Sequence, residues 1–457
     1  MMSEGATPPA DPGSVIRSKS YRILLVLAAL VGAVVSVASW GFLELVHGIQ
    51  QGVFTDLPGE LGFDSVPTWW PLPWLGLAGL LVALAVVLLP GQGGHVPWKG
   101  LGSGAPTQPV ELPGVLVAAV AGLGLGVVLG PEAPLIALGM GLGVLAVRLA
   151  NKDAPDQVVT IVAAAGSFAA VASIFGSPVI GSVIVIEAAG LGGPTLPLVL
   201  LPGLMAAGIG SLIFIGLGSW SGLSSSDYAL SSLSLPAYAR PDISDFGWTI
   251  VLAVAVAIVA VAIVEIGRRS ESLATTRPFV LLPAAGLFVA GCAIAFSEAT
   301  GEPAELVLFS GQEAFAPLVD QTSTLPLSTL ALLLFFKGLA WGVSLGCFRG
   351  GPTFPALLLG VAGGLLVADL PGFSESPAVA ALMGAACVSI LRLPLSSVVI
   401  AIVLAGDAGV GTAPLVIVAV VVAYVAVEGV YALRASLVGA EARAEGEAAP
   451  AQAGAAH

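Results

Sequence analysis

Apolar runs recur along the whole chain, and polar residues gather in the stretches between them. The longer runs approach the roughly 20 residues that a helix needs to cross a bilayer. A membrane β-barrel would instead show ten-residue segments of alternating polarity, which we do not find. The pattern therefore predicts an all-α polytopic membrane protein. Its apolar segments lie near 23–45, 72–90, 110–130, 134–150, 157–175, 178–189, 196–218, 247–266, 278–297, 327–347, 355–369, 377–391, 395–406 and 413–434.

Two motifs occur in the same order in the two halves of the chain. GPEAPLIALGMGLG begins at Gly130 and GPTFPALLLGVAGG at Gly351; SIFGSPVIGSVIVI begins at Ser173 and SILRLPLSSVVIAI at Ser389. Internal repeats in a membrane protein predict two pseudo-symmetric halves with a site between them.

The ends of the chain differ from the membrane portion in composition. Arg17, Lys19 and Arg22 precede the first apolar run, which predicts a cytoplasmic N-terminus. No stretch remains for a folded soluble regulatory domain. We expect a disordered N-terminus (1–20), a membrane domain (21–436) made of repeat one (about 21–218), a polar linker (about 219–246) and repeat two (about 247–436), and a disordered cytoplasmic tail (437–457).

Each repeated motif is a Gly/Pro break followed by a new apolar run, which predicts a helix that starts inside the membrane. A helix N-terminus carries free N–H groups and about half a positive charge, so several such starts would form an anion site. The carboxylate of Glu132 lies at one of these starts. It either competes with a permeant anion until it is protonated, or is a first-turn acid stabilised by the helix dipole without a gating role.

Composition excludes several function classes. The chain is 57% hydrophobic and 9% charged, and its net charge of −13 disfavours nucleic acid as a partner. Cys292, Cys347 and Cys387 are scattered without a pairing or metal-binding spacing, so we expect no disulfide, metal or cofactor. We do not expect an enzyme: a serine hydrolase built on Ser103 and His95 lacks the G-x-S-x-G motif, and no nucleotide-binding P-loop occurs.

Four elements in order resemble the CLC family of chloride channels and proton/chloride antiporters. They are GSGAP from Gly102, GPEAP from Gly130, GSPVIGSVIVIE from Gly176 and GGPTFPALLLG from Gly350, and LFSGQEAFAPLV and RLPLSSVVIAI add weaker matches. The resemblance implies two repeats of inverted topology with about 18 helices, many of them not spanning. It also implies a homodimer with one anion pathway in each subunit, in a bacterial plasma membrane.

The resemblance also implies roles for single residues. Ser103 would offer its hydroxyl to the anion, Glu132 would be the gating glutamate, and backbone N–H groups around Thr353 and Phe354 would help to hold the ion. Tyr431 is the better candidate for the family's anion-binding tyrosine, and Tyr424 is the alternative. The residues expected at the anion are Ser103, Gly104, Glu132, Ala133, Thr353, Phe354 and Tyr431.

Several positions depart from the family's pattern. Pro131 stands where the family usually has Arg, and Pro352 occupies another position before a helix, so each removes one backbone donor. Ala133 replaces a Gly. Thr353 falls where Phe is usual, and its hydroxyl either contacts the anion or caps its helix.

The inner proton relay also departs from the family. Glu187 aligns with the first glutamate of the family's inner pair, and Ala188 stands in place of the second. Glu132 and Glu187 could still form a proton route, water could carry the proton, or the protein conducts chloride without coupling.

We therefore expect selective chloride transport that is channel-like or weakly proton-coupled. The Ser of GSG points to chloride rather than fluoride. The alternatives are a proton/chloride antiporter with a non-standard proton route and a secondary transporter of another small anion, such as an organic acid.

Overall fold

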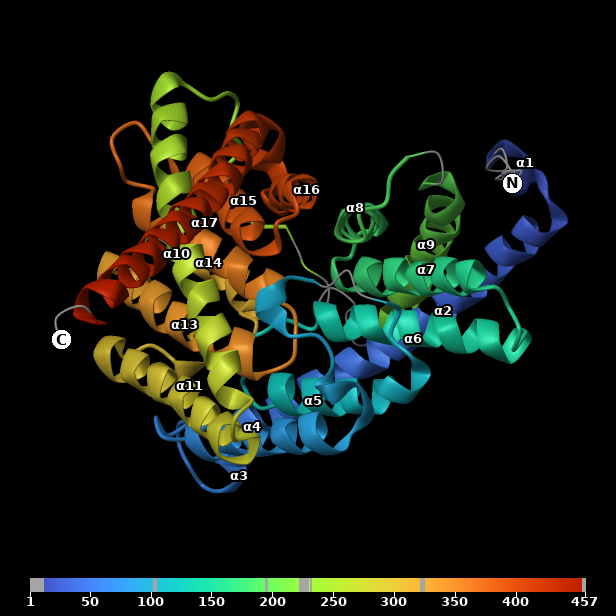
Figure 1. Ribbon diagram of the computed structural model, residues 1–457, viewed down its shortest axis with the longest axis horizontal. Coiled ribbons are helices and arrows are strands. Elements are labelled where there is room, and N and C mark those ends of the chain that lie inside the picture. The colour runs from blue at the N-terminus through green and yellow to red at the C-terminus, as the bar shows by residue number, and fades with distance from the viewer. Residues whose placement is uncertain are drawn as a thin grey trace.

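The computed structural model describes most of the chain, and the described part is built from helices joined by loops (Figure 1). Nine helices within this part are long and apolar enough to cross a membrane, which agrees with the predicted all-α polytopic class. The described residues are 12–101, 105–193, 196–221, 230, 232–320 and 325–453.

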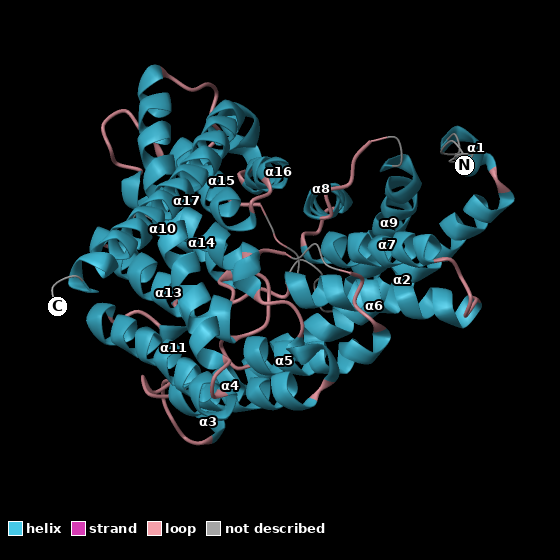
Figure 2. Cartoon of the chain, in the orientation of Figure 1, coloured by secondary structure: helices cyan, strands magenta, loops and turns pink. Residues whose placement is uncertain are grey.

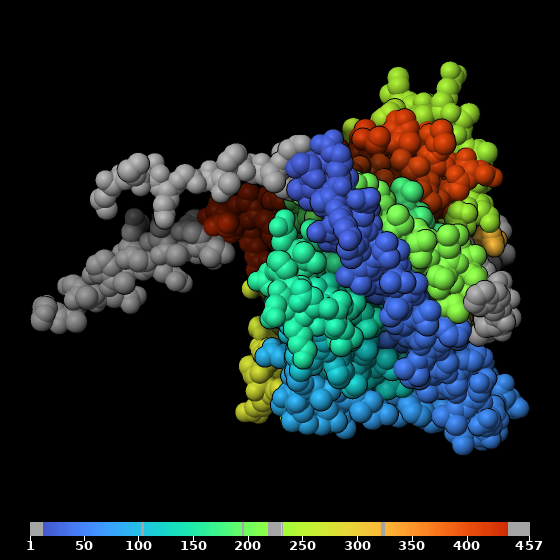
Figure 3. All heavy atoms as spheres, turned by 90° about the vertical axis from the view of Figure 1, so that its right-hand side faces the viewer, coloured from blue at the N-terminus to red at the C-terminus, as the bar shows by residue number. Residues whose placement is uncertain are grey.

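Repeat one forms the blue-to-green group of helices in Figure 1. Its helices are α1 (Pro12–Arg17), α2 (Lys19–Gln51), α3 (Leu57–Glu60), α4 (Pro71–Leu88), α5 (Leu112–Gly124), α6 (Glu132–Ala150), α7 (Asp156–Ile174), α8 (Pro178–Ala188) and α9 (Leu196–Ser221). Helix α6 packs on α7, and α7 packs in turn on α8 and α9. Figure 3 shows α2 running over the outside of this group beside α6 and α7, both of which it contacts.

Repeat two forms the yellow-to-red group. Its helices are α10 (Ile243–Ala274), α11 (Pro278–Thr300), α12 (Phe315–Asp320), α13 (Leu327–Cys347), α14 (Thr353–Val367), α15 (Glu375–Leu391), α16 (Pro394–Leu404) and α17 (Gly409–Ala453). Helix α14 packs on α15, and α15 packs on α16 and α17, in the same order as α6 to α9. The two groups meet at α4 and α11, which pack on each other in the lower part of Figure 1, and at α8 and α16, which are in contact in its upper part.

The four helix starts predicted from the repeated motifs are confirmed. Helices α6, α8, α14 and α16 begin at Glu132, Pro178, Thr353 and Pro394. Proline lies at the first helical position of α8 and α16 and just before α6 and α14, where its missing N–H breaks no helical hydrogen bond. Figure 2 shows the loops that precede several of these starts gathered between the two groups of helices.

Glycines of the repeated motif let neighbouring helices approach closely in both halves. Gly139 and Gly143 of α6 face the backbone of α7, while Gly360 and Gly364 occupy the same motif positions in α14 and face α15. A Cβ atom added at Gly360 would lie 2.5 Å from the Cα atom of Met383. Small residues at such contacts allow the close backbone packing by which membrane helices associate.

The ends of the chain contain more helix than we expected. Helix α1 begins at Pro12, and α2 begins at Lys19 after Ser18, whose Oγ accepts a hydrogen bond from the N–H of Tyr21 at 3.1 Å. At the other end, α17 continues to Ala453, through much of the segment expected to be disordered. The Ala and Glu residues that mark a solvated tail are also strong helix formers, so the membrane helix simply extends into it.

Candidate functional site

The starts of α6 and α14 are joined by their backbones. Gly130 donates its N–H to the carbonyl of Gly351 at 2.7 Å, and Gly351 donates back to the carbonyl of Gly130 at 2.5 Å. These glycines hold the same position in the two repeats. The bridge therefore places the first residues of both helices beside each other.

Glu132 is buried at this junction, with 1% of its surface exposed. Its Oε1 accepts hydrogen bonds from the N–H groups of Thr353 at 2.8 Å and Phe354 at 3.2 Å. Its Oε2 has no hydrogen-bond partner in the described part of the chain. A Cβ atom added at Gly130 or at Gly351 would collide with this carboxylate, so both glycines make room for it.

The carboxylate of Glu132 occupies an anion site built from backbone. The N–H groups of Thr353 and Phe354 lie in the first turn of α14, where the helix leaves them without an internal partner. Together with the positive end of the helix dipole, they favour any anion in this place. Neutralisation or displacement of the side chain would leave the same donors available to another anion.

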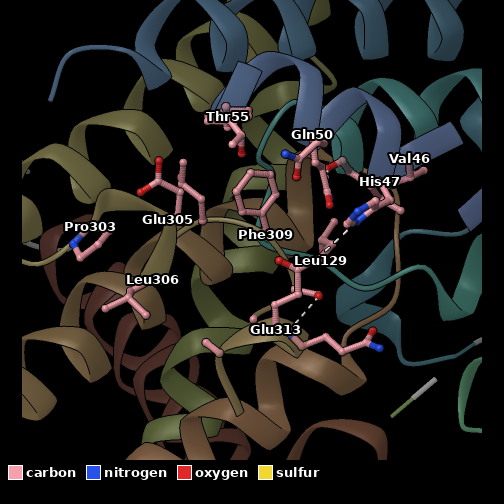
Figure 4. A pocket seen from close by; sticks show the side chains of 18 of the residues that line it. Val46, His47, Gln50, Thr55, Leu129, Pro303, Glu305, Leu306, Phe309 and Glu313 are labelled. Atoms are coloured by element: carbon pink, nitrogen blue, oxygen red, sulfur yellow. Dashed lines mark hydrogen bonds and ion pairs between the residues drawn. The ribbon is translucent and has the colours of Figure 1, made fainter. Parts of the chain in front are cut away.

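The first of two pockets beside Glu132 is lined largely by α2 and the loop before α12, and we call it the Phe309 pocket. Its volume is about 480 Å³, and it reaches Pro131, the residue before Glu132. Figure 4 shows Phe309 in the middle of the labelled side chains, with His47 and Glu313 paired at one side of the pocket. Their Nδ1 and Oε1 atoms lie 3.5 Å apart.

The second pocket, which we call the Arg349 pocket, has a volume of about 270 Å³. It reaches Ala133, the residue after Glu132, and its wall includes Gly91 and Gly93, which follow the end of α4. The buried carboxylate thus lies between residues that belong to two different pockets.

The two pockets lie near opposite ends of the membrane-spanning helix α4. Trp70, just before α4, donates from Nε1 to the carbonyl of Val53 at 2.9 Å, next to Phe54 in the wall of the Phe309 pocket. The Arg349 pocket instead adjoins the loop that leaves α4. A small anion that travels between the pockets would pass the amides that Glu132 occupies.

Comparisons with known proteins agree with this geometry. The family model described as "Voltage gated chloride channel" matches residues 99–428. The chain is 30% identical over 376 residues to the protein named "Putative ion-transport protein YfeO" of Escherichia coli (strain 55989 / EAEC), covering 81% of this chain and 84% of that protein. The chain belongs to the voltage-gated chloride channel family.

Solved structures of this family have the same fold. A slow cyanobacterial chloride/proton antiporter matches with a TM-score of 0.71 and 21% identity, covering 89% of this chain and 94% of that one. A CLC-type fluoride/proton antiporter matches with a TM-score of 0.64 and 18% identity over 88% and 94%. The expected CLC-like architecture of two repeats with broken helices is confirmed, and membership assigns the chain to anion transport among channels and transporters.

The structure brings together some of the residues expected at the anion. Glu132, Thr353 and Phe354 are in contact, and Ala133 lines the Arg349 pocket next to them. Helix α14 has no side-chain cap, so the alternative in which Thr353 caps its own helix finds no support. Two expected residues, Ser103 and Gly104, lie outside the described residues.

Neither candidate tyrosine is placed among the groups that contact Glu132. Tyr431 is 38% exposed on α17, in the field of Arg392, Glu265 and Arg434. The ring of Tyr424 lies 4.2 Å from the guanidinium of Arg392. Helix α17 continues without a break past both tyrosines, which lie on its surface. The other expected anion contacts come from segments where one helix ends and another begins.

Glu187 lies in the last turn of α8 and binds the start of α16. Its Oε1 accepts from the N–H of Leu395 at 2.9 Å, and its Oε2 accepts from the N–H and Oγ of Ser396 at 2.7 and 2.6 Å. The residue before α16, Leu393, supplies no side-chain cap of its own. Glu187 therefore caps a helix of the other repeat, and Ala188 beside it offers no second carboxylate.

Sequence reasoning missed two buried cations beside the two pockets. Lys337 of α13 is fully buried and donates from Nζ to the carbonyls of Leu306, Val307 and Leu308 at 2.9, 3.1 and 2.9 Å. Arg349 lies two residues after the end of α13 and is 9% exposed. A lone charge in or beside a long apolar run is costly, and that signal could have identified both residues.

Proposed function

We propose that the protein carries a monovalent inorganic anion, chloride in the first place, along a path on which the carboxylate of Glu132 competes with the anion. The observation that carries this proposal is the pair of hydrogen bonds from Thr353 and Phe354 to Oε1. The pockets that reach Pro131 and Ala133 provide room for the anion before and after this point. Ser103 and Gly104 join the site through the family resemblance.

Protonation of Glu132 is the proposed opening event. A neutral carboxyl group binds the N–H groups of α14 less strongly than a carboxylate does, because it loses the charge-assisted hydrogen bonds. The anion can then replace it at the same donors. Anion flux should therefore rise as the pH falls.

Coupling of chloride to protons should be weak or absent. Ala188 stands in the place of the family's second inner glutamate, and the three hydrogen bonds to Glu187 hold that carboxylate at the start of α16. A simultaneous record of chloride and proton movement in liposomes tests this, and uphill proton movement driven by a chloride gradient would contradict it.

Family membership and the basic residues before the first apolar run support a proposal for the assembly and placement. We propose a homodimer with one pathway in each subunit, in a bacterial plasma membrane with the N-terminus in the cytoplasm. Exposed apolar side chains on the neighbouring helices α8 and α16 provide a surface for such contacts; they are Val179, Leu395 and Val403.

The function is tested with purified protein in liposomes loaded with chloride, nitrate, fluoride or a small carboxylate. Glu132→Gln removes the charge and keeps the shape, so its chloride flux at neutral pH should match that of the wild type at acidic pH and stay flat. Glu305→Gln is the matched control, because Glu305 lines the Phe309 pocket without contacting the amides of α14. It should keep the wild-type pH response.

Two outcomes would contradict the proposal. If chloride flux depends on pH in the same way in the wild type and in Glu132→Gln, then Glu132 has a structural role and does not gate the path. Transport of the carboxylate with no flux of chloride would favour a carrier of organic anions.

A further inference from the structure

Arg349 presents a buried positive charge to the Arg349 pocket. It lies two residues before Gly351, in the turn between α13 and α14, and only 9% of its surface is exposed. Its Nη1 donates to the carbonyl of Phe348 at 3.1 Å, while its Nε has no hydrogen-bond partner in the described part of the chain. The guanidinium is therefore incompletely satisfied.

No carboxylate within the described ranges forms an ion pair with this guanidinium. Glu271 acts on it only at longer range, and the two oxygens of Glu271 accept hydrogen bonds from Nζ of Lys99 at 2.9 Å and Nε1 of Trp98 at 2.6 Å. Glu111, in the pocket wall, accepts a backbone N–H in a helical cap. A buried cation without a counter-ion is costly.

His95 does not add a second charge at neutral pH. It lines the same pocket, and burial lowers the pKa of its imidazole. Neighbouring Lys99 and Arg349 lower it further, against the opposing effects of Gly100 and Glu271. The fixed positive charge in the pocket wall therefore belongs to Arg349.

We propose that Arg349 binds the permeating anion in the Arg349 pocket, next to the amides that Glu132 occupies. The inference rests on the proposed function and adds a coordinating side chain to it. The site is a chamber of about 270 Å³ whose wall contains Arg349, Gly350 and Ala133, so it adjoins the start of α6 and the turn before α14. A monovalent inorganic anion in this chamber would act as the counter-ion of Arg349, which none of the described carboxylates provides.

The guanidinium also offers a reason why the two helix starts tolerate proline. Pro131 and Pro352 each lack an N–H, so both starts present one backbone donor fewer than an ordinary residue would allow. Arg349 brings several N–H donors and a full charge to the same junction. Its planar fork can hold two oxygens of a planar oxyanion at once, whereas a spherical halide meets it as a point charge.

Anion binding to the purified protein by titration calorimetry tests the proposal, with chloride and nitrate as probes. Arg349→Gln should weaken the binding of both anions by about tenfold or more, since it removes a charged hydrogen-bond donor. Arg349→Lys keeps the charge and loses the planar fork. Its affinity for nitrate should therefore fall by about tenfold, and its affinity for chloride by about threefold or less. Arg148→Gln is the matched control, because Arg148 is an exposed cation in the last turn of α6 that is already paired with Asp156 and does not line the pocket, and it should change binding by less than about twofold.

The outcomes separate the inference from the proposed function. Unchanged affinity for both anions in folded Arg349→Gln would overturn the role of Arg349 even if the wild type transports chloride. If that variant does not fold, an equal response of chloride and nitrate to Arg349→Lys overturns it. A wild type that moves no anion in liposomes refutes the proposed function, whatever Arg349 binds.

Discussion

The two halves of the molecule start their equivalent helices in different ways. In repeat one, α6 begins with the carboxylate of Glu132, and α8 is capped by Ser177, whose Oγ accepts the N–H of Ile180 at 3.3 Å. In repeat two, neither α14 nor α16 has a side-chain cap of its own, and carboxylates of repeat one bind both starts: Glu132 at α14 and Glu187 at α16. Repeat one thus supplies acids, and repeat two supplies free amides.

This difference shows how a duplicated fold acquires a one-sided site. Two identical halves would present either two acids or two empty amide clusters at the junction of α6 and α14. With Glu132 in one half and Thr353 at the equivalent position in the other, one acid faces one cluster. Under the proposed gating role of Glu132, a single protonation event would control the site.

The largest effect is expected from substitutions that widen the close helix contact found at the same position in each half, because they should lower stability most. Gly139→Val and Gly360→Val place side chains against the backbones of α7 and α15, and each should cost about 3 kcal/mol of stability. The midpoint of thermal unfolding in detergent, followed by circular dichroism, measures this loss. Gly291→Val is the control, because nothing lies within 4 Å of a Cβ atom at Gly291. Equal behaviour of all three variants would show that the glycines do not set the packing.

A second change tests the cap that crosses between the halves. Glu187→Ala removes three hydrogen bonds at the start of α16 and should lower the free energy of unfolding by about 2 kcal/mol. Glu187→Gln keeps one acceptor oxygen, so its free energy of unfolding should fall by less than that of Glu187→Ala. Glu298→Ala, an exposed acid on α11, should stay within about 0.5 kcal/mol of the wild type. If Glu187→Ala is as mild as this control, α16 does not depend on repeat one.

The smallest effect is expected for the cap that stays within one half. Ser177→Ala removes the single hydrogen bond to the N–H of Ile180, and such a cap contributes about 1 kcal/mol. The same unfolding assay should therefore rank it below Glu187→Ala. The reverse order would mean that the local cap, rather than the one from the other repeat, governs this contact.

Local sequence signals predicted the helix starts, and the family resemblance implied a role for the amides that bind Glu132. Gly/Pro breaks mark the residues at which a helix begins, and the repeated motifs indicated that the starts of α6 and α14 belong together. The carboxylate, Thr353 and Phe354 lie 221 and 222 residues apart in sequence, yet the family resemblance aligned them with one site. These features depend on short motifs and could be read directly.

The rest depends on contacts that no local pattern encodes. The binding of Glu187 to α16 spans 208 and 209 residues and requires the packing of α8 on α16. The position of Tyr431 depends on whether α17 continues or breaks, and a uniformly apolar run followed by helix-forming residues does not decide this. The sequence marks Arg349 as a charge beside an apolar run, but only the structure shows that none of the described carboxylates forms an ion pair with it.

The bridge between Gly130 and Gly351 limits how transport can proceed. A carrier that works by rocking its two halves would have to break both of these backbone hydrogen bonds in every cycle. With the backbone tied beside Glu132, a movement of that one side chain against a fixed frame costs less free energy than breaking the bridge. The rate of transport would then depend on a rotamer change of Glu132 and on its protonation. Cooling or a stiffer lipid should therefore slow this protein less than it slows a carrier that rocks its two halves.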